Sequence, residues 1–305
     1  MSKKIIIRIL GNDFEMHGED RTYINLEFTL DNEKNFKDTT KLFILNKIID
    51  SGKKKRIINL LKKHNIKYID FPFDKTEYNK LKNKNWNDIE NFFEKISYED
   101  KDKEKWIPCI SKNRKHILNK LNPFNQYIIN NNGMRNIALD YGKKSNYDWI
   151  FVLDSNNFIL EDDYNYIFST LDPATEYIIL PTKRLTDNDF DNIDVFNYKK
   201  IEELDFHEPQ IGFKNTSQLY FNKHIPYGSS PKVELLQVLG VKGKWDEWND
   251  YEKYFNIKCR EKCEVEYQIS SKIIRLKSSS SGNNNTRINW YKRIIDFYNL
   301  LKDIK

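Results

Sequence analysis

The sequence predicts an α/β fold in which a mixed, Rossmann-type sheet is flanked by helices. Short β-branched runs alternate with segments whose apolar residues recur at helical spacing, and this alternation is typical of βαβ units. The five consecutive apolar residues of 149–153 indicate a strand that is buried on both faces of the sheet. A chain of 305 residues fits one large domain, or one domain with an appendage.

The first 71 residues alternate regularly between strand and helix. The run 4–10 is β-branched and leads into a Gly-Asn-Asp loop, so we expect it to be the first strand. Because apolar residues recur at helical spacing between the next extended runs, those runs are expected to be joined by helices. Further strands are expected at 41–46 and 66–71, and helices at 23–35 and 54–64.

Residues 74–112 differ in composition from the segments around them. Lys, Asn, Asp and Glu dominate there, with Trp86, Phe92, Phe93 and Trp106 as isolated aromatic residues. We expect a helical or irregular insertion that lies over the sheet. After it we expect helices at 113–121, 131–141, 231–239 and 288–301, strands at 149–153, 177–180, 210–213 and 272–276, and a Ser/Gly/Asn loop at 278–285.

Composition excludes several classes of protein. Lys and Arg number 51 against 45 Asp and Glu, a net charge of +6, and because the basic residues are dispersed among acidic ones they do not indicate a nucleic-acid partner. Three cysteines are too few for a disulfide framework. No apolar run approaches the roughly 18 residues of a membrane span, and Arg8 interrupts the apolar start of the chain. We therefore expect a cytoplasmic protein without an integral membrane segment.

The amino-acid usage reflects the coding genome more than the chemistry of the protein. Lys, Asn, Ile, Phe and Tyr have A/T-rich codons, and these residues are abundant in the chain. An AT-rich genome fits a microbial eukaryote or a large DNA virus. A viral protein of this kind would be expected in the host cytoplasm or in the virion.

The segment 132–157 carries the most informative pattern. A helix is entered through Gly133 and carries Arg135 near its start, and the buried strand that follows ends at Asp154. In open α/β sheets, ligands lie beyond the carboxyl ends of the strands. An aspartate there can hold a hard divalent cation that neutralises a diphosphate leaving group, and the arginine and the helix dipole can assist it.

At these residues the sequence resembles the GT-A nucleotide-sugar glycosyltransferases, particularly glycosyltransferase family 2. Members of that group commonly carry a Gly-x-Ala-Arg-Asn helix and a strand that ends in Leu-Asp-x-Asp. Here the helix reads Gly-Met-Arg-Asn at 133–136, and the strand ends in Leu-Asp-Ser-Asn at 153–156. Asn156 therefore stands where the family has its second acid.

The resemblance implies a GT-A-like single domain. Residues 1–240 would form the transferase domain, with the insertion at 74–112, and residues 241–305 would form a C-terminal extension that closes over the active site. The implied activity is the transfer of a sugar from a nucleoside-diphosphate-sugar to a hydroxyl of a glycan, a protein or a lipid-linked acceptor, with inversion at the anomeric carbon.

The resemblance also implies a set of site residues. Asp154 and Asn156 would hold Mn²⁺ or Mg²⁺, although the Asn156 amide contributes no charge and leaves metal dependence open. Asp50 is a candidate for the nucleotide, but it could equally cap the helix that follows it. The residues expected to bind the nucleotide-sugar are Gly11, Asn12, Asn46, Asp50, Arg135, Asn136, Asp154, Asn156 and Arg287.

An inverting transferase needs a carboxylate that takes the proton of the acceptor hydroxyl. Three carboxylates fall in the expected zone: Asp246, between two tryptophans; Glu234, near the start of a predicted helix; and Glu208, before a proline and a predicted strand. Asp246 and Glu234 rank slightly ahead of Glu208 as the catalytic base, and the choice among the three stays open.

Two other activities remain compatible with the sequence. A sugar-phosphate nucleotidyltransferase shares the nucleotide-binding layout, but its usual glycine-rich loop after the first strand is missing because only Gly11 is available there. A catalytically degenerate protein that binds nucleotide-sugar or glycan without turnover is the other alternative, and Asn156 keeps it open. Slow hydrolysis of a donor sugar would distinguish a transferase from such a binding protein.

Overall fold

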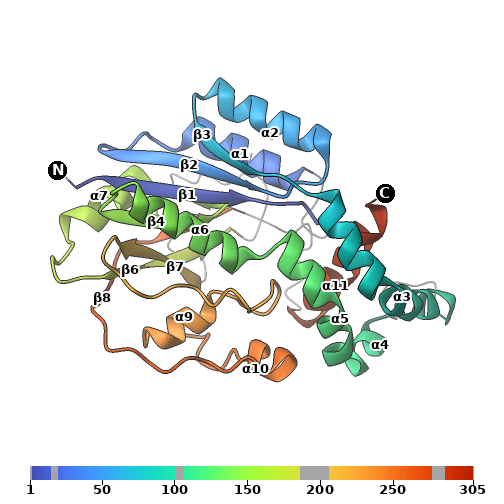
Figure 1. Cartoon of the computed structure of the whole chain (residues 1–305). Helices are drawn as coiled ribbons and strands as arrows, with labels where there is room; N and C mark the ends of the chain where they lie inside the picture. The colour runs from blue at the N-terminus through green and yellow to red at the C-terminus, as the bar shows by residue number, and fades with distance from the viewer. Residues whose placement is uncertain (1, 15–19, 100–105, 186–205, 277–285, 305) are drawn as a thin grey trace.

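The computed structural model describes residues 2–14, 20–99, 106–185, 206–276 and 286–304. Its described strands form one mixed sheet in the order β3-β2-β1-β4-β7-β6-β9-β5, and β8 pairs with β6 (Figure 1). The strands are β1 (Lys4–Leu10), β2 (Thr39–Asn46), β3 (Lys67–Phe71), β4 (Trp149–Asp154), β5 (Asn157–Phe158), β6 (Tyr177–Arg184), β7 (Phe206–Lys214), β8 (Tyr267–Ile269) and β9 (Ile273–Arg275).

Helices lie on both faces of this sheet and at one end of it (Figure 1). The α/β fold class predicted from the sequence, a mixed sheet flanked by helices, is therefore confirmed. The described helices are α1 (Arg21–Asn32), α2 (Ser51–Lys63), α3 (Lys75–Glu99), α4 (Trp106–Lys112), α5 (Arg114–Ile128), α6 (Asn131–Lys144), α7 (Glu161–Ser169), α9 (Val233–Val238), α10 (Asp250–Phe255) and α11 (Thr286–Asp303).

The order of the strands creates a switch point between β1 and β4. The chain runs outward from β1 through β2 to β3 and then returns to the other side of β1 as β4, and these four strands are parallel. Strand β7 is antiparallel to β4 and β6, and β9 is parallel to β6. The carboxyl ends of β1, β2, β4, β6 and β9 therefore share one edge with the start of β7. Ligands bind at such switch points in open α/β sheets.

Alternating strand residues build the two faces of the core. Ile5 and Ile7 of β1 pack with residues of α6 and α9, whereas Ile6 faces a cluster that includes residues of α7. On β2, Phe43 and Leu45 pack against α1 and α2. This period of two explains why the strands read as continuous apolar runs: each face of the sheet is covered by helices.

The segment 74–112, expected to be helical or irregular, forms helices α3 and α4, and the helical region continues through α5. These helices have their own core, which they share with the C-terminal helix α11. The ring of Tyr298 on α11 lies 5.7 Å from that of Trp86 and 3.9 Å from that of Phe93, both on α3. The end of the chain therefore packs on the helical insertion beside the sheet (Figure 1).

Several predicted elements differ in their bounds from those in the structure: α1 ends three residues before the expected 35, α5 extends seven residues beyond the expected 121, and β6 extends four residues beyond the expected 180. Two further differences lie beside the cavity described below. The helix expected at 231–239 begins only at Val233, because Ser230 adopts a left-handed backbone conformation with φ 51° immediately before it. Strand β7 begins at Phe206, four residues earlier than expected, because its first residues pair with the end of β6. The predicted loop at 278–285 lies outside the described residues. Within the described part of the chain, no helix has the length and apolar character needed to cross a membrane.

Candidate active site

A cavity of about 830 Å³ opens at the sheet edge where β1, β2, β4, β6 and β9 end. Because β7 runs in the opposite direction, its early residues His207 and Glu208 reach the same edge. Parts of the loops 227–232 and 247–250, together with helix α11, complete the described lining. The volume lies in the range of roughly 300–1,000 Å³ that small-molecule sites occupy.

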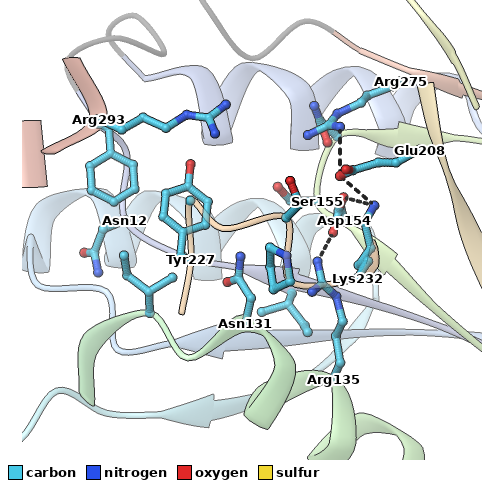
Figure 2. Close-up of a pocket in the computed structure, with 18 of the residues that line it drawn as sticks. Asn12, Asn131, Arg135, Asp154, Ser155, Glu208, Tyr227, Lys232, Arg275 and Arg293 are labelled. Carbon is cyan, nitrogen blue, oxygen red and sulfur yellow. Dashed lines mark hydrogen bonds and ion pairs between the residues drawn. The ribbon is translucent and has the colours of Figure 1, made fainter. Parts of the chain in front are cut away.

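A chain of alternating charges crosses the floor of the cavity (Figure 2). The Asp154 carboxylate, at the end of β4, accepts hydrogen bonds from Arg135 Nη2 at 2.7 Å and from Lys232 Nζ at 3.0 Å. The same ammonium lies 3.4 Å from Glu208 Oε1, which in turn lies 3.8 Å from Arg275 Nη1. The arrangement places two carboxylates among three cations, so it carries a net positive charge.

The cations determine the ionisation of these two carboxylates. Burial alone would raise the pKa of Asp154, but the neighbouring cations, Lys232 first, hold that pKa well below its usual value. The pKa of Glu208 is also lowered, because the attraction of Lys232 and Arg275 outweighs the effect of burial. Both groups are therefore ionised at neutral pH and are weak proton acceptors.

Three guanidinium groups line the cavity, and two of them repel the third, Arg184. Arg184 and Arg275 are register partners at the ends of the parallel strands β6 and β9, and Arg293 of α11 lines the same cavity. Burial first, and then repulsion from Arg275 and Arg293, lowers the pKa of Arg184 to about 10, with Glu208 as the opposing charge. Like charges held this closely destabilise the ligand-free protein.

The unused donors of this cluster point to an anionic ligand. The Nε atoms of Arg275 and Arg293 are buried and have no hydrogen-bond partner among the described residues. Buried donors without partners are costly, so a bound group that accepts hydrogen bonds would relieve the cost. Across the described lining, seven basic side chains face five acidic ones: Arg21, Arg114, Arg135, Arg184, Lys232, Arg275 and Arg293 against Asp13, Asp154, Glu208, Glu247 and Asp250.

The other side of the cavity is lined by amides and aromatic rings. The rings of Phe14 and Tyr227 are stacked with centroids 5.6 Å apart, and Arg293 lies over Tyr227 at 5.8 Å (Figure 2). Asn12 donates to Lys47 O at 3.0 Å and accepts from the Ile49 amide at 2.8 Å. The Asn12 side chain therefore fixes the loop after β2 while also lining the cavity.

The N-terminus of α6 positions Arg135. Asn130 has a left-handed backbone conformation (φ 33°), and its side chain accepts a hydrogen bond from the Gly133 amide at 2.9 Å. A Cβ at Gly133 would lie 2.5 Å from the Asn130 side chain, so this cap requires glycine. One turn into the helix, the fully buried Asn132 accepts from Arg135 Nη1 at 2.7 Å. The Gly-Met-Arg-Asn pattern thus acts through a capped helix start.

Asn156, which stands where the resembled family has an acid, holds two segments of the site together. Its side-chain nitrogen donates to Leu276 O at 2.7 Å, and its backbone carbonyl accepts from the Leu276 amide at 2.7 Å. Leu276 follows Arg275, so these two bonds fix the end of β9 against the turn after β4. An aspartate could not donate the first of these bonds.

Of the twelve residues proposed from the sequence, seven line the cavity, four lie outside the described lining, and the side chain of one, Arg287, is not described. Asp50 caps α2 by accepting from the Lys53 amide at 2.9 Å, and Asn136 bonds both backbone groups of Phe221. Arg287 lies in the first turn of α11, and its side chain is outside the described part of the chain. The proposed residues that line the cavity are Gly11, Asn12, Asn46, Arg135, Asp154, Asn156 and Glu208.

The two carboxylates ranked first as the base lie outside the described lining. Glu234 is fully buried and forms a bidentate pair with Arg260, with both distances at 2.7 Å. Asp246 accepts from the Gly243 amide at 3.2 Å and lies 3.4 Å from Lys242. Both carboxylates therefore serve local structure, whereas Glu208, ranked third, lies in the cavity.

Sequence reasoning missed several lining residues, including Lys232, Arg184 and Tyr227. Lys232 and Arg184 are two of 51 basic residues, and no local pattern distinguishes them from solvated ones. The only available signal for Lys232 was its place in a Gly-Ser-Ser-Pro loop at the start of a predicted helix.

The donor set at Asp154 does not fit a divalent metal ion. Its two carboxylate oxygens accept from Arg135, Lys232 and Gln210, the last at 3.1 Å, and the Asn156 amide nitrogen is committed to Leu276. Mg²⁺ and Mn²⁺ require oxygen ligands around the ion, in near-octahedral geometry for Mg²⁺. In the described part of the chain, no group of three or more His, Cys, Asp or Glu residues is placed to hold a metal. The metal expected from the sequence stays a prediction.

Comparison with known proteins finds similar solved structures only at low sequence identity. No protein-family model matches the chain, and no curated protein matches it. One similar structure is the 4-diphosphocytidyl-2C-methyl-D-erythritol synthase of Anaerococcus prevotii DSM 20548, with 10% identity, coverage of 96% of this chain and 99% of that one, and a TM-score of 0.36. Mouse xyloside xylosyltransferase 1 in its apo form has 9% identity, coverage of 87% and 84%, and a TM-score of 0.33. The function proposed below comes from the residues of the cavity.

Proposed function

We propose that this protein is a glycosyltransferase that takes a sugar from a nucleoside-diphosphate-sugar and transfers it to a hydroxyl acceptor. The observation that carries the proposal is the cluster of Arg184, Arg275 and Arg293 in one cavity, with Glu208 as the opposing carboxylate. A diphosphate offers the negative charge and the acceptor oxygens that such a cluster lacks. One guanidinium group can donate two parallel hydrogen bonds to the oxygens of a phosphate.

The remainder of the cavity suits the two uncharged parts of the same ligand. The amides of Asn12, Asn46 and Asn131 offer hydrogen bonds to a base or a ribose, and the stacked rings of Phe14 and Tyr227 offer an aromatic face. The sugar would then lie toward Trp248, which lines the cavity and is 40% exposed. A ligand with an aromatic end, a dianionic middle and a polar sugar end could use each of these groups of side chains.

The proposed reaction needs groups that stabilise the leaving diphosphate, and it needs one group that accepts a proton. The bond between the anomeric carbon and the diphosphate oxygen breaks, the diphosphate keeps the electron pair, and the acceptor oxygen bonds to the carbon. Fixed guanidinium groups stabilise the charge that develops on the diphosphate, because they are already oriented before the reaction begins. The acceptor proton passes to a carboxylate.

Glu247 is the carboxylate of the lining that best suits the proton transfer. Asp154 and Glu208 are held by cations, Asp250 lies 3.0 Å from Arg114, and Asp13 lies 3.7 Å from Lys53. Glu247 is exposed and, within the described residues, has no ion pair. Its neighbour Trp248 supplies an aromatic face for an acceptor sugar. The proposed base is thus one residue away from Asp246, one of the three candidates from the sequence.

A ligand panel followed by a turnover assay tests the proposal. Thermal denaturation is measured with nucleoside diphosphates and nucleoside-diphosphate-sugars, and a ligand at about one hundred times its Kd adds about 2.7 kcal/mol to stability. We expect one nucleotide to stabilise the protein selectively, and its sugar conjugate to be hydrolysed slowly with release of nucleoside diphosphate. Pyrophosphate release from a nucleoside triphosphate and a sugar phosphate would instead indicate a nucleotidyltransferase. Binding without turnover would indicate a binding protein, and no shift across the panel would refute all three.

Replacing Glu247 with glutamine tests its role as the base, with Asp246→Asn as the matched control. We expect Glu247→Gln to lower kcat for transfer by at least about 100-fold, the lower end of the range for general-base catalysis, while the Kd for the nucleoside diphosphate stays unchanged. Asp246→Asn should leave both unchanged because Asp246 lies outside the described lining. Loss of transfer in Asp246→Asn but not in Glu247→Gln would reverse this assignment. Inverting stereochemistry, membership of glycosyltransferase family 2, a viral source and a cytoplasmic location stay predictions.

A further inference from the structure

Lys232 lies where two carboxylates of the cavity converge. Its ammonium is 3.0 Å from Asp154 Oδ2 and 3.4 Å from Glu208 Oε1, and its side chain is only 3% exposed (Figure 2). A buried lysine between two carboxylates supplies the positive charge that a divalent cation would supply at the same position. We propose that the Lys232 ammonium takes the place of a metal ion between Asp154 and Glu208, so that the site binds its phosphate-bearing ligand without a divalent cation.

The surroundings of Asp154 favour the ammonium over a metal. Among the described residues, each hydrogen-bond partner of its carboxylate is an N–H donor: Arg135 on Oδ1, and Lys232 and Gln210 on Oδ2. A divalent ion in this position would meet the positive charges of Arg135 and Lys232 instead of oxygen ligands. Asn156 adds no carboxylate, because its side chain is an amide, and its nitrogen donates to the carbonyl of Leu276. The substitution of an acid by Asn156 and the presence of Lys232 are therefore consistent with each other.

The backbone fixes Lys232 at this position before any ligand binds. Ser230 has a left-handed conformation with φ 51°, and α9 starts directly after Lys232. Asn132 of α6 donates to Pro231 O at 2.6 Å and also accepts from Arg135, so one buried amide orients both cations that contact Asp154. A cation positioned in this way needs no reorganisation when a ligand arrives.

The ammonium also has capacity left for a ligand. It carries three N–H donors, and Asp154 and Glu208 occupy two of them at most. Because Lys232 lines the cavity, the remaining donor is available to a phosphate oxygen. The identity of the ligand as a nucleoside-diphosphate-sugar rests on the proposed function, whereas the replacement of a metal by Lys232 does not.

Mn²⁺ binding to the ligand-free protein tests the inference directly. Electron paramagnetic resonance titrations of Mn²⁺ are compared for the wild type, Lys232→Ala and Lys232→Met, with Lys242→Ala as a control that removes an exposed lysine 3.4 Å from Asp246. We expect no tight Mn²⁺ site in the wild type or in Lys242→Ala, and a new site in Lys232→Ala, where Asp154 Oδ2 and Glu208 Oε1 both lose the ammonium that lies between them. The methionine variant keeps the volume of the stem if the alanine variant does not fold. Mn²⁺ binding by the wild type, or by none of the proteins, would overturn the inference.

Nucleoside diphosphate affinity gives a second reading on the same proteins. We expect the wild-type Kd to be unchanged by EDTA, and Lys232→Ala to bind at least about tenfold more weakly and to recover part of the loss with Mn²⁺. An EDTA-sensitive wild type would overturn the inference. If no nucleotide binds under any condition, the proposed function fails while the Mn²⁺ titration still decides the role of Lys232.

Discussion

Replacing Arg184 with methionine should stabilise the ligand-free protein and weaken its binding of anions. Burial first, and then repulsion from Arg275 and Arg293, lowers the pKa of Arg184 to about 10. The folded state therefore binds this proton more than about a hundredfold less tightly than the unfolded chain does. Stability recovers only as the pH rises above about 10, so at neutral pH the whole penalty is present. At about 1.4 kcal/mol for each tenfold change in proton affinity, the penalty is about 3 kcal/mol.

Methionine keeps the apolar stem of the side chain and removes its charge. After some loss of packing, we expect the unfolding free energy of ligand-free Arg184→Met to rise by about 2 kcal/mol, which corresponds to an increase in Tm of about 4 °C. The same change removes one charged donor from the proposed diphosphate site. A hydrogen bond to a charged group contributes about 1.5–3 kcal/mol, so affinity should fall at least about tenfold.

Thermal denaturation and calorimetric titration with inorganic pyrophosphate measure both effects. Lys63→Met is the matched control because it removes one positive charge from an exposed position on α2, outside the described lining. We expect this control to change neither Tm nor pyrophosphate affinity appreciably. A ligand-free Arg184→Met that is less stable than the wild type, with unchanged pyrophosphate affinity, would refute the charge argument.

Two further substitutions test the supports of the site. Asn156→Asp replaces a donor to Leu276 O by a carboxylate oxygen. We therefore expect a loss of about 1–3 kcal/mol in unfolding free energy, without any gain of Mn²⁺ binding. Unchanged stability in chemical denaturation would contradict the structural role of Asn156. Gly133→Ala places a Cβ 2.5 Å from the Asn130 side chain and should cost about 1 kcal/mol net, because the lost cap exceeds the gain in helix propensity. Gly52→Ala, whose Cβ would meet Asp50 Oδ1 at 3.2 Å, is the control in the same assay, and equal effects of the two changes would argue against the cap.

Local patterns were sufficient to predict the sheet edge that carries the site. The apolar run 149–153 forms β4, the run 4–10 forms β1, and the two are parallel neighbours. Because strand ends define the ligand edge of an open α/β sheet, Asp154 and Gly11 could be assigned to it from sequence. Arg135 followed from its place one helical turn into the preceding helix.

The choice of the proposed base shows the limit of prediction from local sequence patterns. Asp246 and Glu247 are adjacent in sequence and share the same tryptophan neighbours, yet only Glu247 belongs to the described lining. The turn at 243–246 decides between them, since Asp246 accepts from the Gly243 amide within it. Both are carboxylates that lie between Trp245 and Trp248, so the sequence offers no means to decide which of them lines the cavity.

What the sequence by itself determined was the α/β class, the order of its main elements and the edge at which a ligand would lie, because these follow from hydrophobic periodicity and strand ends. Only the tertiary structure decided which charges share the cavity. Lys232 reaches Asp154 across 78 positions of the chain, and Arg184 meets Arg275 because β6 and β9 pair in parallel. Such long-range pairing depends on how whole elements pack, and a single basic residue carries no local signal of it.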